Sequence, residues 1–301
     1  MLDYFIKSQD FIGHSGQVFS IDFDGKNIYS ASADKFVTRW DLISGTQDNF
    51  VIRFEKTPYA IRLFSNNSKL AVGLENGDLH FFDLIEKKES KFYQQHKSAI
   101  FFLLENRSKS HLYSSDAEGN LAVWNTETLK LEVILPFDCG KIRRMMLNSN
   151  ESKLYLACQD GILRVLETIY FNLIEEFSCH PNGLTAFALV SGNENQLLTG
   201  GKDAHLKLWD LETRTCLTSI PAHNYVIYDI LFLDSKHFVT VSRDKSIKFW
   251  DSDQFTVIQK IDIKRGGHKH SVNSIIKISD LSFATCSDDK TIRLFSKSNL
   301  L

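Results

Sequence analysis

Histidine, hydroxyl and carboxyl side chains recur together in this sequence in a pattern that could support nucleophilic catalysis. Three groups share this composition and a comparable spacing: His14, Ser30, Asp34 and Trp40; His180, Thr199, Asp203 and Trp209; and His223, Thr240, Asp244 and Trp250. A hydrolase needs one exposed nucleophile beside one base and an oxyanion site, whereas several copies along a chain are typical of a building element. We therefore expect a structural role for the three groups, and no catalytic residue.

Two other patterns could bind a metal ion or a phosphate. His268 and His270 are separated by one residue, but no third ligand is evident from the spacing, so we interpret them as a repeat histidine and a loop neighbour. Gly200, Gly201 and Lys202 lack the Gly-x-x-x-x-Gly-Lys-Ser/Thr spacing of a phosphate loop. We expect a hairpin turn there, and neither a metal nor a cofactor in the protein.

Composition and charge exclude several classes of protein. The 301 residues are 43% hydrophobic and 24% charged, which is too apolar for a disordered chain. A formal net charge of −2 provides no overall positive field to hold a nucleic acid. The longest apolar run, residues 99–104, is far shorter than the roughly 20 residues that a membrane-spanning helix needs.

The ends and the cysteines of the chain indicate where the protein resides. The N-terminus lacks the basic stretch, apolar core and cleavage site of a secretory signal. Five single cysteines, with no Cys-x-x-Cys pair, favour reduced thiols over a disulfide framework or a zinc site. We expect an intracellular, cytoplasmic protein without a membrane anchor.

The elements that must position these side chains form an internal repeat. Seven copies fill the chain, and their strongest strands end at Trp40, Phe82, Trp124, Leu166, Trp209, Trp250 and Phe295, with spacings of 42, 42, 42, 43, 41 and 45 residues. Six residues earlier, every copy carries an acid or an amide: Asp34, Asn76, Glu118, Asp160, Asp203, Asp244 and Asp289. The periodicity predicts one structural unit repeated seven times.

The hydrophobic pattern predicts four strands in each copy. In the first copy these are residues 18–23, 27–32, 36–40 and 50–54, and the middle two form a hairpin. Gly77, Gly119 and Gly161 lie in the hairpin turns of copies two to four, where a tight connection requires a positive φ.

The repeat resembles that of the WD-repeat β-propeller family, in which a Gly-His lies near the start and a Trp-Asp near the end of some 40–45 residues. The histidines that carry this resemblance are His14, His96, His180, His223 and His268. Copies two and four lack both the histidine and the tryptophan. The resemblance implies an all-β, seven-bladed β-propeller of four-stranded antiparallel blades, in one domain over residues 1–301. Its closing element would be the N-terminal strand at residues 2–8, which completes blade 7.

The resemblance also implies roles for particular residues. The histidine, hydroxyl, acid and tryptophan of a copy would form a buried hydrogen-bond relay. One face would carry variable positions that contact a partner, and the most prominent of these are Phe19, Tyr59, Phe101, Lys141, Arg143, Lys202, Tyr228 and Arg243. In this prediction the aromatics belong to blades 1–3 and most cations to blades 4–6. Packing of the aromatics at blade junctions is the alternative interpretation.

We therefore expect a non-catalytic scaffold, monomeric by itself, that binds a peptide or loop of another protein with apolar anchors and an acidic stretch. One alternative is a nucleic-acid reader that uses the basic residues of blades 4–6, although the net charge disfavours it. The other is a propeller enzyme, which would need polar ligands along the innermost strands. The corresponding row is mostly apolar: Asp22, Arg62, Leu104, Met146, Ala188, Leu231 and Ile276.

Overall fold

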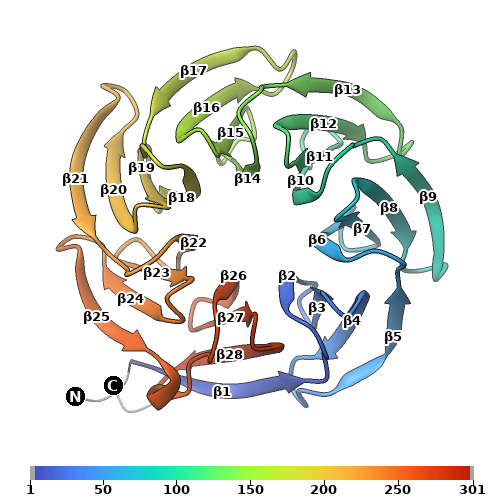
Figure 1. The fold of residues 1–301 in the computed structure, drawn as a ribbon, viewed down its shortest axis with the longest axis horizontal. Helices are drawn as coiled ribbons and strands as arrows, with labels where there is room; N and C mark the ends of the chain where they lie inside the picture. The colour runs from blue at the N-terminus through green and yellow to red at the C-terminus, as the bar shows by residue number, and fades with distance from the viewer. Residues whose placement is uncertain (1–3, 299–301) are drawn as a thin grey trace. The chain divides into compact units, whose positions relative to one another are not determined.

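The computed structural model describes residues 4–298, and over this range the chain forms seven antiparallel sheets of four strands each. One short 3-10 helix, η1 (Ile263–Arg265), is the only helical element in that range, so none of its helices is long enough to cross a membrane. Figure 1 labels the strands in chain order. The predicted all-β fold of a seven-bladed propeller is confirmed.

The chain divides into two compact units, residues 1–52 with 186–301 and residues 53–185, with boundaries near the end of β5 and the start of β18. In the first unit, blade 1 contains β2 (Val18–Phe23), β3 (Asn27–Ser32), β4 (Phe36–Asp41) and β5 (Gln47–Arg53); blade 5 contains β18 (Leu184–Val190), β19 (Asn193–Gly201), β20 (His205–Asp210) and β21 (Thr215–Pro221); blade 6 contains β22 (Ile227–Phe232), β23 (His237–Ser242), β24 (Ile247–Asp251) and β25 (Thr256–Ile261); and blade 7 contains β26 (Val272–Ser279), β27 (Ser282–Ser287), β28 (Thr291–Lys297) and β1 (Phe5–Ile12).

In the second unit, blade 2 contains β6 (Pro58–Phe64), β7 (Lys69–Leu74), β8 (Asp78–Asp83) and β9 (Lys88–Gln94); blade 3 contains β10 (Ile100–Asn106), β11 (His111–Asp116), β12 (Asn120–Asn125) and β13 (Leu131–Pro136); and blade 4 contains β14 (Ile142–Leu147), β15 (Lys153–Cys158), β16 (Ile162–Glu167) and β17 (Leu173–Ser178). Both units are thus built from the predicted repeat. The prediction of one domain over residues 1–301 stays a prediction.

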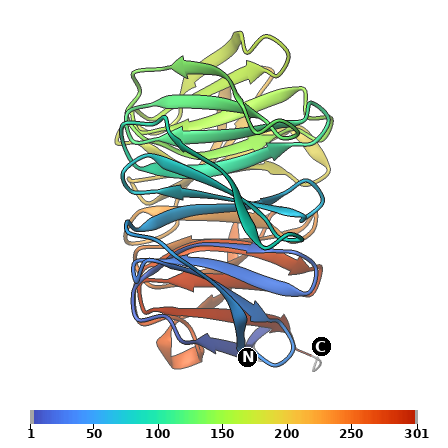
Figure 2. The same ribbon diagram turned by 90° about the vertical axis from the view of Figure 1, so that its right-hand side faces the viewer.

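The N-terminal strand completes blade 7, where β1 pairs antiparallel with β28 from Phe5↔Lys297 to Ile12↔Thr291 (Figures 1 and 2). Its predicted limits, residues 2–8, are wrong at the C-terminal end. The pairing passes a bulge between Lys7 and Gln9 and continues to Ile12, because Phe11 is buried in the apolar layer between blades 7 and 1. Residues 2 and 3 lie outside the described residues.

Position within a blade determines how deeply a strand is buried. The second strand is enclosed on both faces, and in β3 five consecutive residues from Ile28 to Ser32 are buried. The last strand alternates instead, and in β5 no residue is fully buried. A sheet covered on both faces needs apolar or hydrogen-bonded side chains at every position, whereas an outer strand needs them on one face only. In blade 1, burial is therefore greatest in the second strand and least in the last strand.

The core consists of apolar layers between successive blades. In the first unit, Phe249 of blade 6 packs with Phe283 and Phe295 of blade 7, and Phe11 of blade 7 packs with Trp40 of blade 1. In the second unit, Phe81 of blade 2 packs with Trp124 of blade 3. Burying such side chains contributes about 1.5–3 kcal/mol each. Stability thus comes from contacts between blades as well as from pairing within them.

The hairpin turns have the predicted positive φ. Gly77, Gly119 and Gly161 have φ values of 90°, 90° and 87°. A Cβ at Gly161 would lie 1.8 Å from the carbonyl oxygen of His180, so the turn also needs glycine because of the close backbone approach. The corresponding residues of blades 1 and 6, Lys35 and Lys245, have φ of 72° although each has a side chain.

Phe5 is a direct test of the role of β1. Its side chain lies 5.0 Å from the ring centroid of Phe249 and 5.1 Å from that of Phe283, and its backbone exchanges two 2.8 Å hydrogen bonds with the amide of Gln259. We expect Phe5→Ala to reduce the free energy of unfolding by about 3–5 kcal/mol, as truncation of buried phenylalanines does. Urea unfolding at pH 7 measures this loss.

Ile6→Ala is the matched control, because Ile6 lies on the same strand with 48% of its side chain exposed. We expect it to cost less than about 1 kcal/mol. Deletion of residues 1–9 should lower the melting temperature more than either substitution. Equal unfolding free energies for the two alanine variants would contradict the proposed anchoring of β1.

Candidate functional site

Five histidines occupy the same place in their blades, four residues before the innermost strand, and all five are buried. In blade 1, His14 Nδ1 lies 2.8 Å from Asp34 Oδ2 and His14 Nε2 lies 2.8 Å from Ser30 Oγ. Trp40 Nε1 donates to the same hydroxyl at 2.7 Å. The four side chains form a continuous chain of hydrogen bonds, to which Thr38 adds a further hydroxyl.

The predicted group of blade 6 has the same geometry. In blade 6, His223 lies 2.9 Å from Asp244 and 2.7 Å from Thr240, and Trp250 Nε1 donates to Thr240 Oγ1 at 2.9 Å. Asp244 also accepts a hydrogen bond from the backbone of Asn224. Each acid therefore accepts hydrogen bonds from both an imidazole and a loop amide.

The predicted residues of blade 5 occupy positions that correspond to those of the groups in blades 1 and 6. Trp209 Nε1 donates to Thr199 Oγ1 at 2.9 Å, and Asp203 accepts from the backbone N–H of His205 at 3.2 Å. His180 is fully buried, and its backbone N–H donates to Gly161 O.

Sequence reasoning missed two further relays. In blade 3, His96 contacts Asp116 at 2.8 Å and Ser114 at 2.7 Å. The repeat alignment assigned the acid of this copy to Glu118, which is wrong, since Glu118 only donates its backbone N–H to Asp116. Asp116 was missed because the alignment required an acid exactly six residues before the tryptophan. The signal that could have identified it is His96, which needs an acid nearby as its partner.

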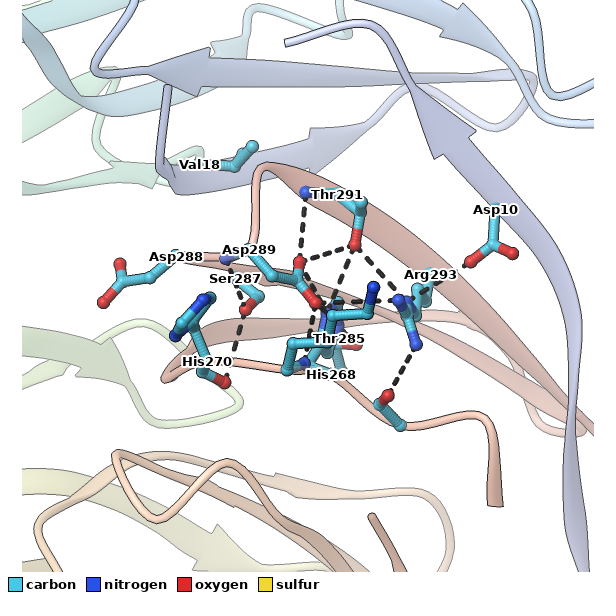
Figure 3. Close-up of polar contacts among 12 residues, drawn as sticks. Asp10, Val18, His268, His270, Thr285, Ser287, Asp288, Asp289, Thr291 and Arg293 are labelled. Carbon is cyan, nitrogen blue, oxygen red and sulfur yellow. Dashed lines mark hydrogen bonds and ion pairs between the residues drawn. The ribbon is translucent and has the colours of Figure 1, made fainter. Parts of the chain in front are cut away.

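Blade 7 contains the other relay, without a tryptophan (Figure 3). His268 lies 3.0 Å from Asp289 and 2.9 Å from Thr285. Arg293 lies beside the relay, 3.6 Å from Asp289, and also donates to the carbonyls of Gly266 and Gly267 at 2.8 and 2.6 Å. Its Nε lies 3.3 Å from Asp10 of β1. The guanidinium therefore links the N-terminal strand to the loop that carries His268.

Burial controls the protonation of these relays. It lowers the pKa of the His223 and His268 imidazoles despite their acid partners, which favours neutral rings at pH 7. Burial alone would raise the pKa of Asp244 and Asp289, but hydrogen bonds from the histidines and from neighbouring hydroxyls lower it far below its usual range. A neutral histidine can donate through Nδ1 to the carboxylate and accept the hydroxyl proton at Nε2.

This arrangement leaves the relay hydroxyls closed to substrates. Ser30, Ser114 and Thr240 have no exposed surface, and each accepts an indole N–H. A nucleophile must reach the substrate, so these hydroxyls serve as hydrogen-bond connectors. Within residues 4–298 no three His, Cys, Asp or Glu side chains are grouped to hold a metal ion. His268 is buried in its relay, whereas His270 is exposed.

The predicted partner residues of the second unit converge on one aromatic side chain. The rings of Tyr59 and Phe101 stack at 5.6 Å with 24° between their planes. Lys141 Nζ lies 4.6 Å and Arg143 Cζ 5.4 Å from the centroid of Phe101. All four side chains are partly exposed. We call Tyr59, Phe101, Lys141 and Arg143 the Phe101 cluster; its members come from blades 2, 3 and 4.

In this unit the aromatics of blades 2 and 3 and the cations of blade 4 meet at Phe101. Lys141 and Arg143 lie over the ring of Phe101, because a cation is attracted to the face of an aromatic ring. In the first unit, Phe19 and Tyr228 are partly buried, in β2 and β22, while Lys202 and Arg243 are exposed in the hairpin turns of blades 5 and 6. Both basic and aromatic side chains are thus accessible in each unit.

Comparison with known proteins agrees with this repeat. A family model described as "WD domain, G-beta repeat" matches residues 6–41, 171–210, 214–251 and 259–296, which together make up half of the chain. The chain belongs to the WD40 family. The matched segments include the relays of blades 1, 6 and 7 and the predicted relay residues of blade 5. Blades 2 and 3 and the first three strands of blade 4 lie outside the matched segments, and these blades have the same four-stranded topology.

Several WD repeat proteins are similar over most of the chain. A striatin homolog from Dictyostelium discoideum is 22% identical and covers 94% of this chain. A WD repeat-containing protein 55 homolog from the same organism is 22% identical and covers 77%, and WD repeat-containing protein 55 from Arabidopsis thaliana is 21% identical and also covers 77%. The chain spans 34%, 56% and 66% of the lengths of these relatives, respectively.

Asp244→Ala tests whether a relay stabilises its blade. The substitution leaves His223 Nδ1 and the backbone N–H of Asn224 without their acceptor. We expect the free energy of unfolding to fall by about 1–3 kcal/mol, the cost of leaving buried donors unsatisfied. Asp253→Ala, an exposed acid in the same blade, is the matched control and should change stability by less than about 0.5 kcal/mol. Similar values for both variants in urea unfolding would argue against the role.

The relays also predict how stability depends on pH. The pKa values of His223 and His268 are lowered in the folded protein. As the pH falls below 6.5, the ordinary pKa of histidine, these two residues therefore bind protons in the unfolded chain but stay neutral in the folded one. The ordinary pKa of an aspartate is 3.8, so unfolded aspartates take up protons below about pH 4. In the folded protein Asp244 and Asp289 stay ionised there, because their pKa is lowered. The free energy of unfolding should therefore decrease from pH 7.5 to 5.5 and decrease further as the pH falls below about 4.

Urea unfolding at these pH values measures both steps. The double variant His223→Asn and His268→Asn removes the two buried imidazoles and should reduce the step between pH 7.5 and 5.5, whereas His270→Asn, on an exposed histidine, should not. A wild-type stability that is constant over this interval would show that the buried histidines do not resist protonation.

Proposed function

We propose that this WD40 protein is a non-catalytic scaffold that binds a peptide or loop of another protein through the Phe101 cluster. WD40 proteins generally bind other proteins, which supports the general role. The observation that carries the specific proposal is the convergence of Tyr59, Lys141 and Arg143 on the ring of Phe101. Their partial exposure leaves this group accessible.

The chemistry of the cluster defines the ligand. Tyr59 and Phe101 together present a continuous aromatic surface, which suits an apolar anchor side chain. Lys141 and Arg143 bring two positive charges close to the same ring, and a carboxylate placed there would interact with both. Tyrosine and arginine are also common among the residues that dominate binding energy. The proposed ligand is therefore an acidic peptide with at least one apolar or aromatic side chain.

The remaining predicted contacts belong to the first unit. Lys202 and Arg243 are exposed, and Phe19 and Tyr228 are partly exposed. We include them in the proposed partner surface as a separate part, to be tested by separate variants. We also propose that the protein acts as a monomer in the cytoplasm; its five free cysteines, four of them buried, suit a reducing compartment.

A charge-reversal variant tests the cluster directly. We expect Lys141→Glu combined with Arg143→Glu to weaken binding to acidic peptides at least tenfold, because attraction becomes repulsion. The probes are fluorescent peptides of alternating Asp or Glu with one Leu or Phe, and the measurement is fluorescence anisotropy with purified protein. The same peptides with Lys in place of the acids should not bind to the wild type. The melting temperature should stay within a few degrees of the wild type.

Lys109→Glu combined with Lys130→Glu is the matched control, since both lysines are exposed in the same unit and lie outside the cluster. It changes the net charge equally and should retain peptide binding. Equal affinity of the wild type and the cluster variant would refute the proposed site. Preferential binding of a single-stranded oligonucleotide, with affinity falling steeply as salt is added, would favour the nucleic-acid alternative instead.

A further inference from the structure

Blade 4 lacks a histidine relay and contains a different polar group in its place. Leu156 pairs with Arg164 in the register in which Ser30 pairs with Thr38 in blade 1, so a leucine replaces the relay hydroxyl. Asp160 binds Arg164 through two hydrogen bonds of 2.7 and 3.1 Å. The acid of this repeat is thus paired with a guanidinium within the blade and not with an imidazole.

The loop before β14 differs as well. Asp138 stands four residues before the strand, where five other blades carry their histidine, but it has φ of 48° and is exposed. This turn directs the next residue inward, and Cys139 is only 3% exposed. The carbonyl of Cys139 accepts a 3.2 Å hydrogen bond from the backbone N–H of Asp160. The loop is therefore held against the β15–β16 hairpin with a thiol on its inner side.

A second thiol lies opposite the first. Cys158 ends β15, is fully buried and pairs with Ile142, three residues after Cys139. Both cysteines are buried in one packed cluster of the second unit, and each thiol affects the pKa of the other. The charge of the Arg164 guanidinium, which is paired with Asp160, also affects the pKa of both thiols. A thiol of the loop before β14 and a thiol at the end of β15 are thus buried together near a cation.

We propose that Cys139 and Cys158 form a redox-reactive thiol pair that a hydroperoxide oxidises to a disulfide. The site is independent of the proposed peptide-binding function. The paired segments are already held by backbone hydrogen bonds, so the bond would require little movement of the backbone. A nearby guanidinium favours the thiolate, which is the reactive form of a cysteine.

Cys139 is the residue that would react first. Contact with Cys158 and the charge of Arg164 lower its pKa, whereas contact with Cys139 and burial raise the pKa of Cys158. The Cys139 thiolate attacks the peroxide oxygen, the O–O bond breaks, and a sulfenic acid and one water or alcohol result. The Cys158 sulfur then attacks the sulfenic sulfur, the S–S bond forms and a second water leaves with the thiol proton. Two electrons and two protons pass from the thiols to the peroxide.

The experiment uses the full chain in a Cys216→Ser background, which removes the one exposed thiol. Folded, reduced protein is treated with hydrogen peroxide, alkylated under denaturing conditions and cleaved with trypsin. We expect the fragments 131–141 and 154–164, which contain Cys139 and Cys158, to become joined and to separate again on treatment with dithiothreitol. Cys179 and Cys286 should remain alkylated as thiols. Oxidation should also raise the urea midpoint, because a cross-link restricts the unfolded chain.

Cys139→Ser in the same background is the decisive comparison. It should abolish both the joined fragments and the rise in urea midpoint, while Cys158 remains a thiol. Three results would overturn the proposal: oxidation of Cys139 to a sulfinic acid with Cys158 unchanged, fragments that join only when peroxide is added to unfolded protein, or no reaction of either thiol. Cys179→Ser should behave as the background protein does and controls for the removal of a buried thiol.

Discussion

The inability of a single four-stranded blade to bury its own faces is the constraint on which the rest of the structure depends. The second strand of a blade has side chains on both faces that are removed from water, as in β3 and β11. One of these faces can only be covered by a neighbouring blade. Packing between blades therefore determines which residues each repeat must contain, and polar groups inside must be satisfied without water.

The tryptophan of the repeat meets both demands with one side chain. In blade 1, Trp40 donates its N–H to Ser30 within the blade while its ring contacts Phe11 of blade 7. In blade 3, Trp124 donates to Ser114 while its ring contacts Phe81 of blade 2. The relay thus fixes the position of an indole that packs against the preceding blade. A hydroxyl, a histidine and an acid are needed because an indole N–H buried without an acceptor would be costly.

The sequence was sufficient to predict the repeat, its four strands and the composition of the relays, because these depend on local spacing. It was not sufficient where a change of backbone shifts a residue by one or two places. Asp116 replaces the expected acid of blade 3, and the positive φ of Asp138 places Cys139, the next residue, inside blade 4. Such changes leave the periodicity of the sequence intact, so an alignment by spacing alone assigns the wrong residue.

The Phe101 cluster illustrates a second limit of the same kind. Residue types indicated that Tyr59, Phe101, Lys141 and Arg143 were candidates for an interface, but sequence order placed the aromatics and the cations in different blades. Side chains of different blades can meet when each leans towards its neighbour, and a half-buried ring is a favourable place for a nearby cation. This contact has two consequences: it orders long flexible side chains before a ligand arrives, and it keeps their charge near an apolar surface. Pre-ordered charge beside an aromatic ring reduces the entropy lost on binding, which is why such a cluster is better suited to recognising a short acidic peptide than separate lysines on a polar face.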